Sequence, residues 1–225
     1  MQRDPVTIFF EIVVLLFAIS VHESAHAWMA NRLGDPTAKM LGRVSLNPLV
    51  HIDLFGTILL PAMLILLGFP PFGYAKPTPV DNRNFRNPVR DDILTAVAGP
   101  VSNFLTALIA VICLAVILHG TGGAVTPTFG GADVGSPLAK MFELAIWINV
   151  ILGVFNLIPL PPLDGSHVIR HFLSYETLKV YDSVGYFGLV IVMFVLPMVG
   201  CSVVGTMAAP FLVFFYSLLN ALVRL

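Results

Sequence analysis

Two histidines and a glutamate in the first apolar run have the types and the spacing of a metal site. The run contains His22-Glu23-Ser24-Ala25-His26. Histidines four positions apart share one face of a helix, so both imidazoles can bind the same ion. The glutamate between them can take a proton from a water on that ion. This H-E-x-x-H pattern is typical of zinc metallopeptidases, and it predicts His22 and His26 as ligands and Glu23 as the general base.

The apolar surroundings of the motif strengthen this interpretation. A charge at the centre of a membrane helix costs about 2.5–3.5 kcal/mol, and the motif places three polar groups within five positions. A bound metal ion compensates for that cost. The alternative is a polar cluster that only packs against neighbouring helices. Glu11 stands alone about three turns earlier and is interpreted as an interfacial carboxylate.

A catalytic zinc ion usually has three protein ligands and one open position, so a third ligand is expected. The remaining candidates near the same membrane face are His51, Asp53, Asp164, His167 and His171. Asp164 stands out because it follows three prolines that must end the preceding helix. Unwound backbone at membrane depth is tolerated only where it lines a cavity or packs in protein. Spacing alone leaves a simple surface turn at Pro162–Gly165 equally open. His51 and Asp53 are interpreted as interfacial residues, with hydrogen bonding to the metal ligands as their alternative role, and His167 is the reserve ligand.

The composition indicates a membrane protein. The chain has 225 residues, of which 57% are hydrophobic and only 11% are charged, against roughly 25% charged residues in a typical soluble domain. The length favours a single domain, residues 1–225. The net charge of −1 and the lack of a basic patch disfavour nucleic acid as a partner. Cys113 and Cys201 both lie in apolar runs, so no disulfide framework is expected.

Apolar runs of about 20 residues predict an all-α polytopic fold with about five to six transmembrane helices. The predicted spans are Val6–Met29, Ile93–Leu118, Leu138–Leu157 and two within Val184–Leu222, which Pro197 and Gly200 divide. The run Leu54–Phe69 is shorter and contains Pro61. It is therefore predicted to be a re-entrant or β-like segment after the first helix.

The distribution of basic residues favours the re-entrant alternative, because cytoplasmic loops are enriched in Lys and Arg. Residues 32–53, 73–92 and 160–183 carry basic side chains, whereas residues 119–137 carry none. Five spans then put the three basic segments and the C-terminus inside and the N-terminus outside. This arrangement brings Asp164 to the same membrane face as the two histidines. A full span at Leu54–Phe69 would put it on the opposite face.

Three motifs together resemble the site-2 protease family of intramembrane zinc metallopeptidases. They are His22-Glu-Ser-Ala-His26, Ala98-Gly99-Pro100-Val-Ser-Asn103 and Asn156-x-x-Pro159-x-Pro161-x-Leu163-Asp164-Gly165. Their order matches a catalytic core at about residues 6–165, followed by C-terminal helices at about 184–223. The resemblance is to a compact form without PDZ or CBS domains.

The resemblance implies one Zn²⁺ per chain, bound by His22, His26 and Asp164. Glu23 would activate the water and later protonate the leaving amine. Asn156 would hold the substrate strand or stabilise the oxyanion, with a polar contact between helices as its alternative role. Gly99, Pro100 and Asn103 are interpreted as residues for close helix packing.

The expected function is hydrolysis of peptide bonds in transmembrane segments of protein substrates, within the lipid bilayer. The site would lie nearer the cytoplasmic face of a prokaryotic cell membrane. Residues 43–47 are predicted to offer an edge strand to the unwound substrate. The alternatives are a membrane metal-ion transporter and a non-catalytic metal-binding protein. The lack of a two-fold repeat disfavours the first, and the intact Glu23 disfavours the second.

Overall fold

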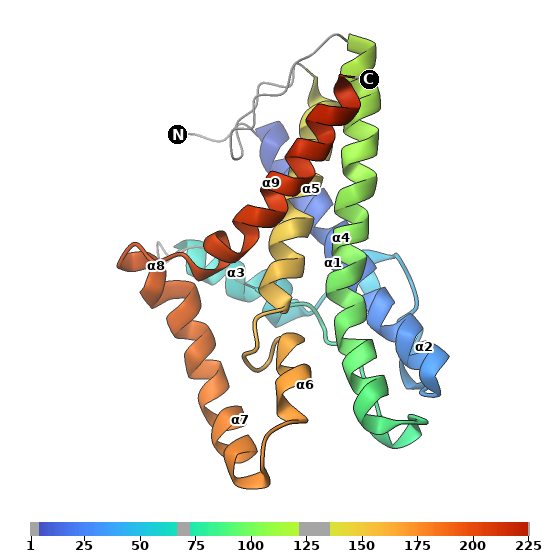
Figure 1. Cartoon of the computed structure of the whole chain (residues 1–225), viewed down its shortest axis with the longest axis vertical. Coiled ribbons are helices and arrows are strands. Elements are labelled where there is room, and N and C mark those ends of the chain that lie inside the picture. Colours follow the sequence, from blue (N-terminus) through green and yellow to red (C-terminus); the bar gives the residue numbers. More distant parts are fainter. Residues whose placement is uncertain (1–4, 67–72, 122–135, 225) are drawn as a thin grey trace. The chain divides into compact units, whose positions relative to one another are not determined.

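The computed structural model describes residues 5–66, 73–121 and 136–224, and within them every regular element is a helix (Figure 1). The elements in chain order are α1 (Pro5–Leu33), α2 (Thr37–Met40), η1 (Pro48–Val50), η2 (Leu54–Leu59), α3 (Leu60–Leu66), η3 (Asn82–Asn84), α4 (Pro88–Thr121), α5 (Pro137–Asn156), α6 (Gly165–Arg170), α7 (Tyr175–Val190), η4 (Ile191–Val195), α8 (Leu196–Met198) and α9 (Val203–Val223). The predicted all-α class is confirmed. Residues 43–47 form no strand, so the edge-strand hypothesis remains a prediction about the substrate complex.

Four helices in the described residues are long and apolar enough to cross a membrane. They are Val6–Leu33, Pro88–His119, Pro137–Asn156 and Val203–Val223. The helix pair Tyr175–Gly185 and Phe187–Met198, bent by 41°, would be a fifth span. These spans agree with the predicted number.

The fifth span begins earlier in the sequence than the predicted Val184. The side chain of Ser174 caps α7 by accepting a hydrogen bond from the Thr177 amide. The short apolar helix Leu54–Leu64 occupies most of the predicted re-entrant run. The end of that run, residues 67–69, and most of the loop without Lys or Arg, residues 122–135, lie outside the described residues.

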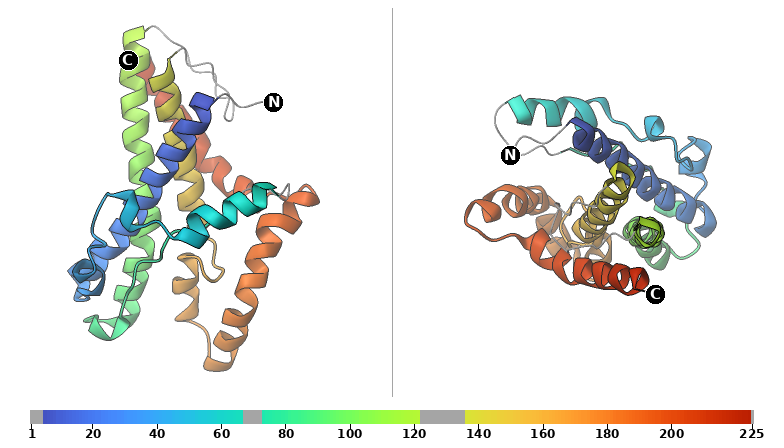
Figure 2. Two further views of the ribbon diagram at one scale, coloured as in Figure 1. Left: turned by 180° about the vertical axis from the view of Figure 1, so that it is seen from behind. Right: turned by 90° about the horizontal axis from the view of Figure 1, so that it is seen from above.

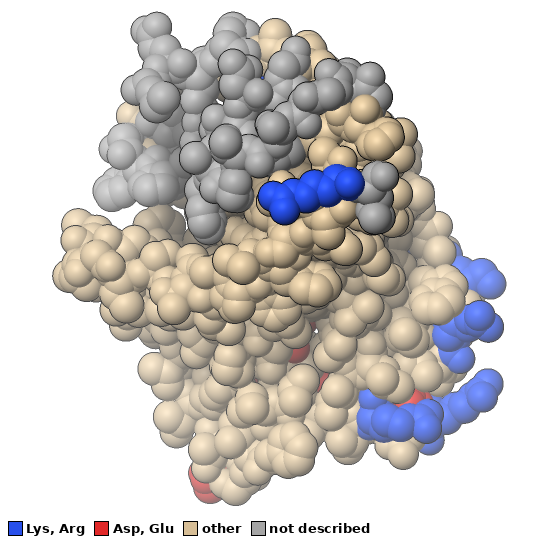
Figure 3. All heavy atoms as spheres, turned by 45° about the horizontal axis from the view of Figure 1, so that its top comes forward, with Lys and Arg blue, Asp and Glu red and all other residues tan. Residues whose placement is uncertain are grey.

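Apolar side chains remain exposed along the predicted spans. Phe9 and Ile12 on α1, Ile109 on α4 and Val213 on α9 are all at least half exposed. Most of the described atoms drawn in Figure 3 belong to residues other than Lys, Arg, Asp and Glu. So much exposed apolar surface suits contact with lipid rather than with water.

The chain divides into two compact units, and the first comprises residues 1–18 and 100–225. Its core is formed by α4, α5 and α9, with α5 packed against α9 (Figures 1 and 2). A buried polar contact joins three helices there. The Asn103 side-chain amide on α4 donates to the Asn149 Oδ1 on α5 at 2.9 Å and to the Ala18 carbonyl on α1 at 3.3 Å. Asn103 is therefore a helix-packing residue, as predicted.

The second unit comprises residues 19–99 and contains the H-E-x-x-H motif. It runs from the end of α1 through α2, η1, η2 and α3, and it returns along an extended stretch to the start of α4. The ring of Tyr74 lies on Gly56, where a Cβ would come within 2.4 Å of it. The Tyr74 amide also donates to the Gly56 carbonyl at 3.1 Å. These contacts attach the extended stretch to η2. The boundaries between the units fall within α1 and α4, and a single domain over 1–225 stays a prediction.

Candidate active site

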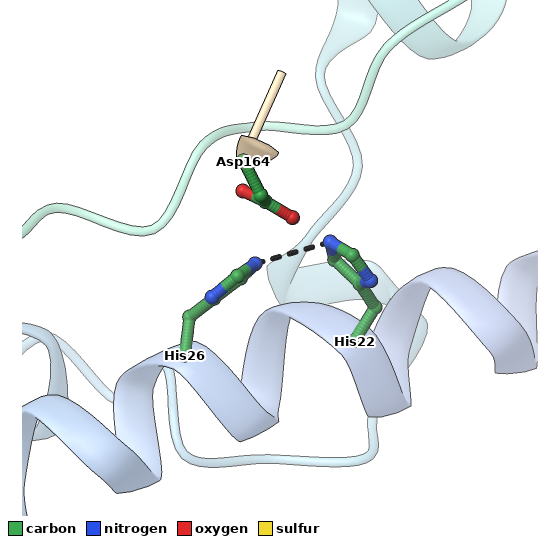
Figure 4. Close-up of side chains that lie close together, drawn as sticks. All are labelled: His22, His26 and Asp164. Carbon is green, nitrogen blue, oxygen red and sulfur yellow. Dashed lines mark hydrogen bonds between the residues drawn. The ribbon is translucent and has the colours of Figure 1, made fainter. Parts of the chain in front are cut away.

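The imidazoles of His22 and His26, both on α1, point toward each other. Their Nε2 atoms lie 3.0 Å apart, and the rings meet edge to face at a centroid distance of 4.6 Å (Figure 4). Both residues are buried, with exposures of 5% and 7%. Two nitrogens on one tetrahedral zinc ion are about 3.3 Å apart, given Zn–N bonds of about 2.0–2.1 Å. The pair is therefore close to the spacing that a shared zinc ion requires.

A hydrogen bond to the backbone determines which ring nitrogen of His26 carries the hydrogen. Its Nδ1 lies 2.7 Å from the Thr95 carbonyl oxygen, which can only accept, so Nδ1 carries the proton. In the neutral ring this leaves the lone pair on Nε2. Metal-binding histidines are commonly oriented in this way, by a hydrogen bond from the other ring nitrogen. Thr95 on α4 thus prepares His26 to be a ligand.

Gly99 on α4 makes the space that the two rings occupy. A Cβ at this position would lie 2.3 Å from the His26 Nε2 and 2.7 Å from the His22 Cε1. No side chain fits there unless at least one imidazole moves. The predicted packing role of Gly99 thus includes direct contact with the proposed ligands. The two imidazole nitrogens are suitable metal ligands. Together with the space left by Gly99, they fit a metal ion.

Glu23 lies between the histidines in sequence and is held by one partner residue. The Thr78 amide donates to the Glu23 Oε2 at 3.0 Å, and the Thr78 hydroxyl donates to the same oxygen at 2.7 Å. The carboxylate is half-buried. The sequence does not single out Thr78 by any chemical motif. Its place between Pro77 and Pro79 is still a signal, because the prolines lack amide hydrogens and leave Thr78 as the only backbone donor of the three residues.

Asp164 lies in the first unit, on a turn that directly precedes α6. The Leu163 and Ser166 amides close successive turns around it, at 2.8 Å to the Leu160 carbonyl and 3.0 Å to the Leu163 carbonyl. The next residue, Gly165, packs so tightly that a Cβ would lie 2.3 Å from the Leu157 carbonyl oxygen. Asp164 is half-buried. The Asp-Gly pair thus forms a constrained turn after the broken helix.

Helix α7, in the same unit, contacts the three-proline segment that precedes Asp164. The Tyr181 hydroxyl donates to the Pro159 carbonyl at 2.8 Å. Gly185 lies against the Pro161 ring, which a Cβ would approach to 2.6 Å. The three-proline segment is thus fixed by contacts with α7 as well as by its own turns.

Asn156 ends α5 and bonds back to its own helix. Its side-chain amide donates to the Leu152 carbonyl at 3.0 Å, which orients the side chain. His167 lies in α6 and His171 directly follows it, and both are half-buried.

The two candidates beside the re-entrant run have structural contacts. His51 is 1% exposed, with its Nε2 2.8 Å from the Ser45 carbonyl and 3.5 Å from the Ser24 hydroxyl. The sequence predicts an interfacial residue here, but the loop of residues 45–51 folds back and buries His51 against α1. Asp53 accepts from the Gly56 amide at 2.7 Å and caps η2.

A glutamate flanked by two converging histidines, on a helix with the composition of a membrane span, is typical of a membrane-embedded metallopeptidase. Comparisons with known proteins agree with this class. Peptidase family M50 matches residues 10–198, so the chain belongs to that family.

The similar proteins carry zinc metalloprotease names. YwhC of Bacillus subtilis is 36% identical over 189 residues, which cover 83% of this chain and 80% of that protein. Rip2 of Mycolicibacterium smegmatis is 28% identical, over 80% of this chain and 64% of that protein. The zinc metalloprotease MJ0392 of Methanocaldococcus jannaschii is 24% identical, over 75% of this chain and 36% of that protein. No solved structure matches the chain. The protein is a zinc metalloprotease of the membrane, which decides against the transporter interpretation.

Proposed function

We propose that this protease cleaves transmembrane segments of other membrane proteins inside the bilayer. The observation that carries the proposal is the position of the motif. His22, Glu23 and His26 lie within Val6–Leu33, a helix long and apolar enough to span a membrane. A base and ligand pair buried at that depth would meet substrates that are themselves in the membrane. The substrate class is thus a protein with a transmembrane helix, which must unwind locally to expose a peptide bond.

Asp164 is the proposed third ligand, and one zinc ion per chain the proposed stoichiometry. The three residues drawn in Figure 4 would supply two imidazole nitrogens and one carboxylate oxygen. This donor set leaves a fourth position open in a tetrahedral site, as catalytic zinc requires. The bound ion would supply Lewis acidity toward a water molecule and the scissile carbonyl.

The side chains of this chain would carry out the proton transfers. Glu23 would accept a proton from the attacking water and then deliver it to the leaving amine nitrogen. Asn156 would donate from its side-chain amide to the oxyanion or to the substrate backbone. Its amide has two hydrogens. One is donated to the Leu152 carbonyl, and the second would serve this role.

The proposed location is a prokaryotic cell membrane, with the site nearer the cytoplasmic face. The basic residues of the segments that flank the site support this orientation. Water needed for hydrolysis would then enter from the cytoplasm.

The test uses the full chain purified in detergent. Zinc content and cleavage of a panel of single-span substrates would be measured for the wild type and for Glu23→Gln. We expect one zinc per chain in both proteins, and a loss of cleavage by at least about 100-fold in the variant, because a general base contributes about 10²–10⁴-fold. Loss of cleavage in chelator and its return with zinc would complete the result.

Two outcomes would contradict the proposal. Cleavage by Glu23→Gln at the wild-type rate would remove the assigned base. Cleavage of soluble peptides, with no cleavage of any membrane-embedded segment, would place the activity outside the bilayer.

A further inference from the structure

The extended segment of residues 73–79 provides a side chain that controls the general base. We propose that Thr78 is a positioning residue that fixes one oxygen of the Glu23 carboxylate and leaves the other to take the proton. Thr78 brings both its amide and its hydroxyl to Glu23 Oε2, at 3.0 and 2.7 Å. The inference rests on the proposed function, because it gives Glu23 the role of base.

Two donors on one oxygen constrain the carboxylate more than either would alone. The hydroxyl also lies 3.1 Å from the Glu23 main-chain carbonyl, so Thr78 contacts both ends of the residue. With Oε2 occupied, rotation of the carboxylate about its last bond would break two hydrogen bonds at once. Oε1 therefore keeps one direction, which is what a base needs if it is to meet a water at a fixed place.

The flanking prolines prepare Thr78 for this role. Pro77 and Pro79 have no amide hydrogen, so Thr78 supplies the only backbone donor of the three residues. A residue before proline is also restricted to extended conformations. The segment thus presents one amide, with the hydroxyl of the same residue beside it, toward α1.

The segment is anchored on both sides of Thr78, so it cannot simply follow a moving carboxylate. The Lys76 amide donates to the His51 carbonyl at 2.9 Å, and the Asp81 amide donates to the Asp35 Oδ2 at 2.8 Å. His51 and Asp35 are both buried. Thr78 is therefore held as a fixed point against which Glu23 is oriented.

The kinetic test compares Thr78→Val, which removes the hydroxyl, with Thr78→Ser, which keeps it. We expect kcat of Thr78→Val to fall by about 10–100-fold with KM nearly unchanged, because an unoriented base loses part of its contribution of about 10²–10⁴. Thr78→Ser should keep kcat within about threefold of wild type. Zinc content should stay at the wild-type value in both variants.

Thr57→Val is the matched control. The Thr57 hydroxyl donates to the Tyr74 carbonyl at 2.9 Å, so its removal loosens the same extended segment without touching Glu23. If kcat of Thr57→Val falls as far as that of Thr78→Val, general loosening explains the effect and the proposal is overturned.

A second readout needs neither zinc nor activity. The Tm of the chelated protein would be measured for Thr78→Val in the wild-type and Glu23→Ala backgrounds. We expect the substitution to lower Tm by about 2–4 °C in the first background and by less than about 1 °C in the second, because its partner is then absent. Equal losses in both backgrounds would show that the hydroxyl does not act through Glu23.

The two readouts separate this inference from the proposed function. If the wild type cleaves no membrane-embedded substrate, the proposed function fails, and the Tm comparison still decides whether Thr78 holds Glu23. If cleavage occurs but kcat of Thr78→Val equals that of wild type, the positioning role is wrong while the protease stands.

Discussion

Gly99 limits the space in which the two histidine rings can lie. Because a Cβ there would come within 2.3 Å of His26 Nε2, Gly99→Ala must displace at least one imidazole. Disturbing a residue that orients a metal ligand typically costs 10–100-fold in affinity. We expect Gly99→Ala to bind zinc about 10–100-fold more weakly than wild type, as measured by competition with a chromogenic chelator.

Gly188→Ala is the control for this prediction. Gly188 also lies in a helix, and a Cβ there would meet only the Leu160 methyl groups, at 3.3 and 3.7 Å. Its zinc affinity should equal that of wild type. Wild-type affinity in Gly99→Ala would show that the rings can move without loss of the ion, and that the tight space beside Gly99 has no role in binding.

Residues that share a local pattern could be predicted, whereas residues that meet through the fold could not. Helical spacing alone places His22 and His26 on one face, and their Nε2 atoms do lie 3.0 Å apart. Their roles as ligands, and that of Glu23 as the base, stay predictions. Thr78 contacts Glu23 across 55 positions, so no local pattern joins them. Asp164 was selected by its place after a broken helix and by family resemblance, and its role as a ligand stays a proposal.

At the scale of the elements, the long apolar runs predicted the helices that are long and apolar enough to cross a membrane, because such runs favour helices of that length. The boundaries were less predictable. Helix α7 begins at Tyr175, where Ser174 caps it, although residues 175–183 are too polar to be recognised as part of a span. The buried position of His51 also escaped prediction, because it depends on a loop that folds back on α1.

The Asp35 carboxylate joins the segment after α1 to the turn before α4. It is fully buried and accepts hydrogen bonds from the Thr37 amide at 3.1 Å, the Asn84 side chain at 2.9 Å and the Asp81 amide at 2.8 Å. Burial alone would raise the pKa of Asp35, but the hydrogen bonds from Thr37, Asp81 and Asn84 outweigh it and hold this pKa below its usual value. The carboxylate therefore stabilises the fold in its charged form.

The lowered pKa of Asp35 gives a pH-dependent stability. A carboxyl group with a depressed folded pKa contributes fully above its unfolded value, and the contribution is lost as pH falls through the folded value. At pH 7 we expect Asp35→Asn to unfold more easily by about 2 kcal/mol, because donors then face a neutral group. The Tm difference from wild type should shrink as pH falls from about 5 to 3, as thermal unfolding in detergent would show.

Asp182→Asn serves as the comparison. Asp182 forms an exposed ion pair with Arg170 at 3.1 Å, and such pairs contribute about 0–1 kcal/mol. This variant should show a small Tm change at pH 7. A Tm difference between Asp35→Asn and wild type that stays constant down to pH 3 would mean that the Asp35 charge has no part in stability. Asp81, with its pKa lowered to about 2 by hydrogen bonds from Arg83, keeps its charge over most of this range.

At the scale of the whole molecule, the orientation of the spans decides which residues can share a membrane face. The short apolar helix Leu54–Leu64 decides this orientation, since it falls short of the roughly 20 residues that a straight crossing needs. If it re-enters, the basic segments on either side of it lie in the cytoplasm together. If it crossed, every later span would be inverted, and Asp164 would be separated from His22 and His26.

Labelling of single cysteines in intact cells tests this orientation. Both native cysteines are free, so Cys113→Ser and Cys201→Ser provide the background. Each labelling variant would add one cysteine to this cysteine-free background: Arg83→Cys, Thr126→Cys or Glu176→Cys. With the N-terminus outside and five spans, a membrane-impermeant maleimide should label position 126 in intact cells, and positions 83 and 176 only after permeabilisation.

The two orientations give opposite results at one decisive position. Re-entry of Leu54–Leu64 keeps position 83 in the cytoplasm, whereas a full crossing would expose it to label in intact cells. Zinc content, measured on the same variants, shows that each one still folds around its ion. Labelling of position 83 in intact cells, together with bound zinc, would therefore exclude Asp164 as the third ligand. Asp164 would then lie at the opposite membrane face from His22 and His26, and the ion would be bound without it.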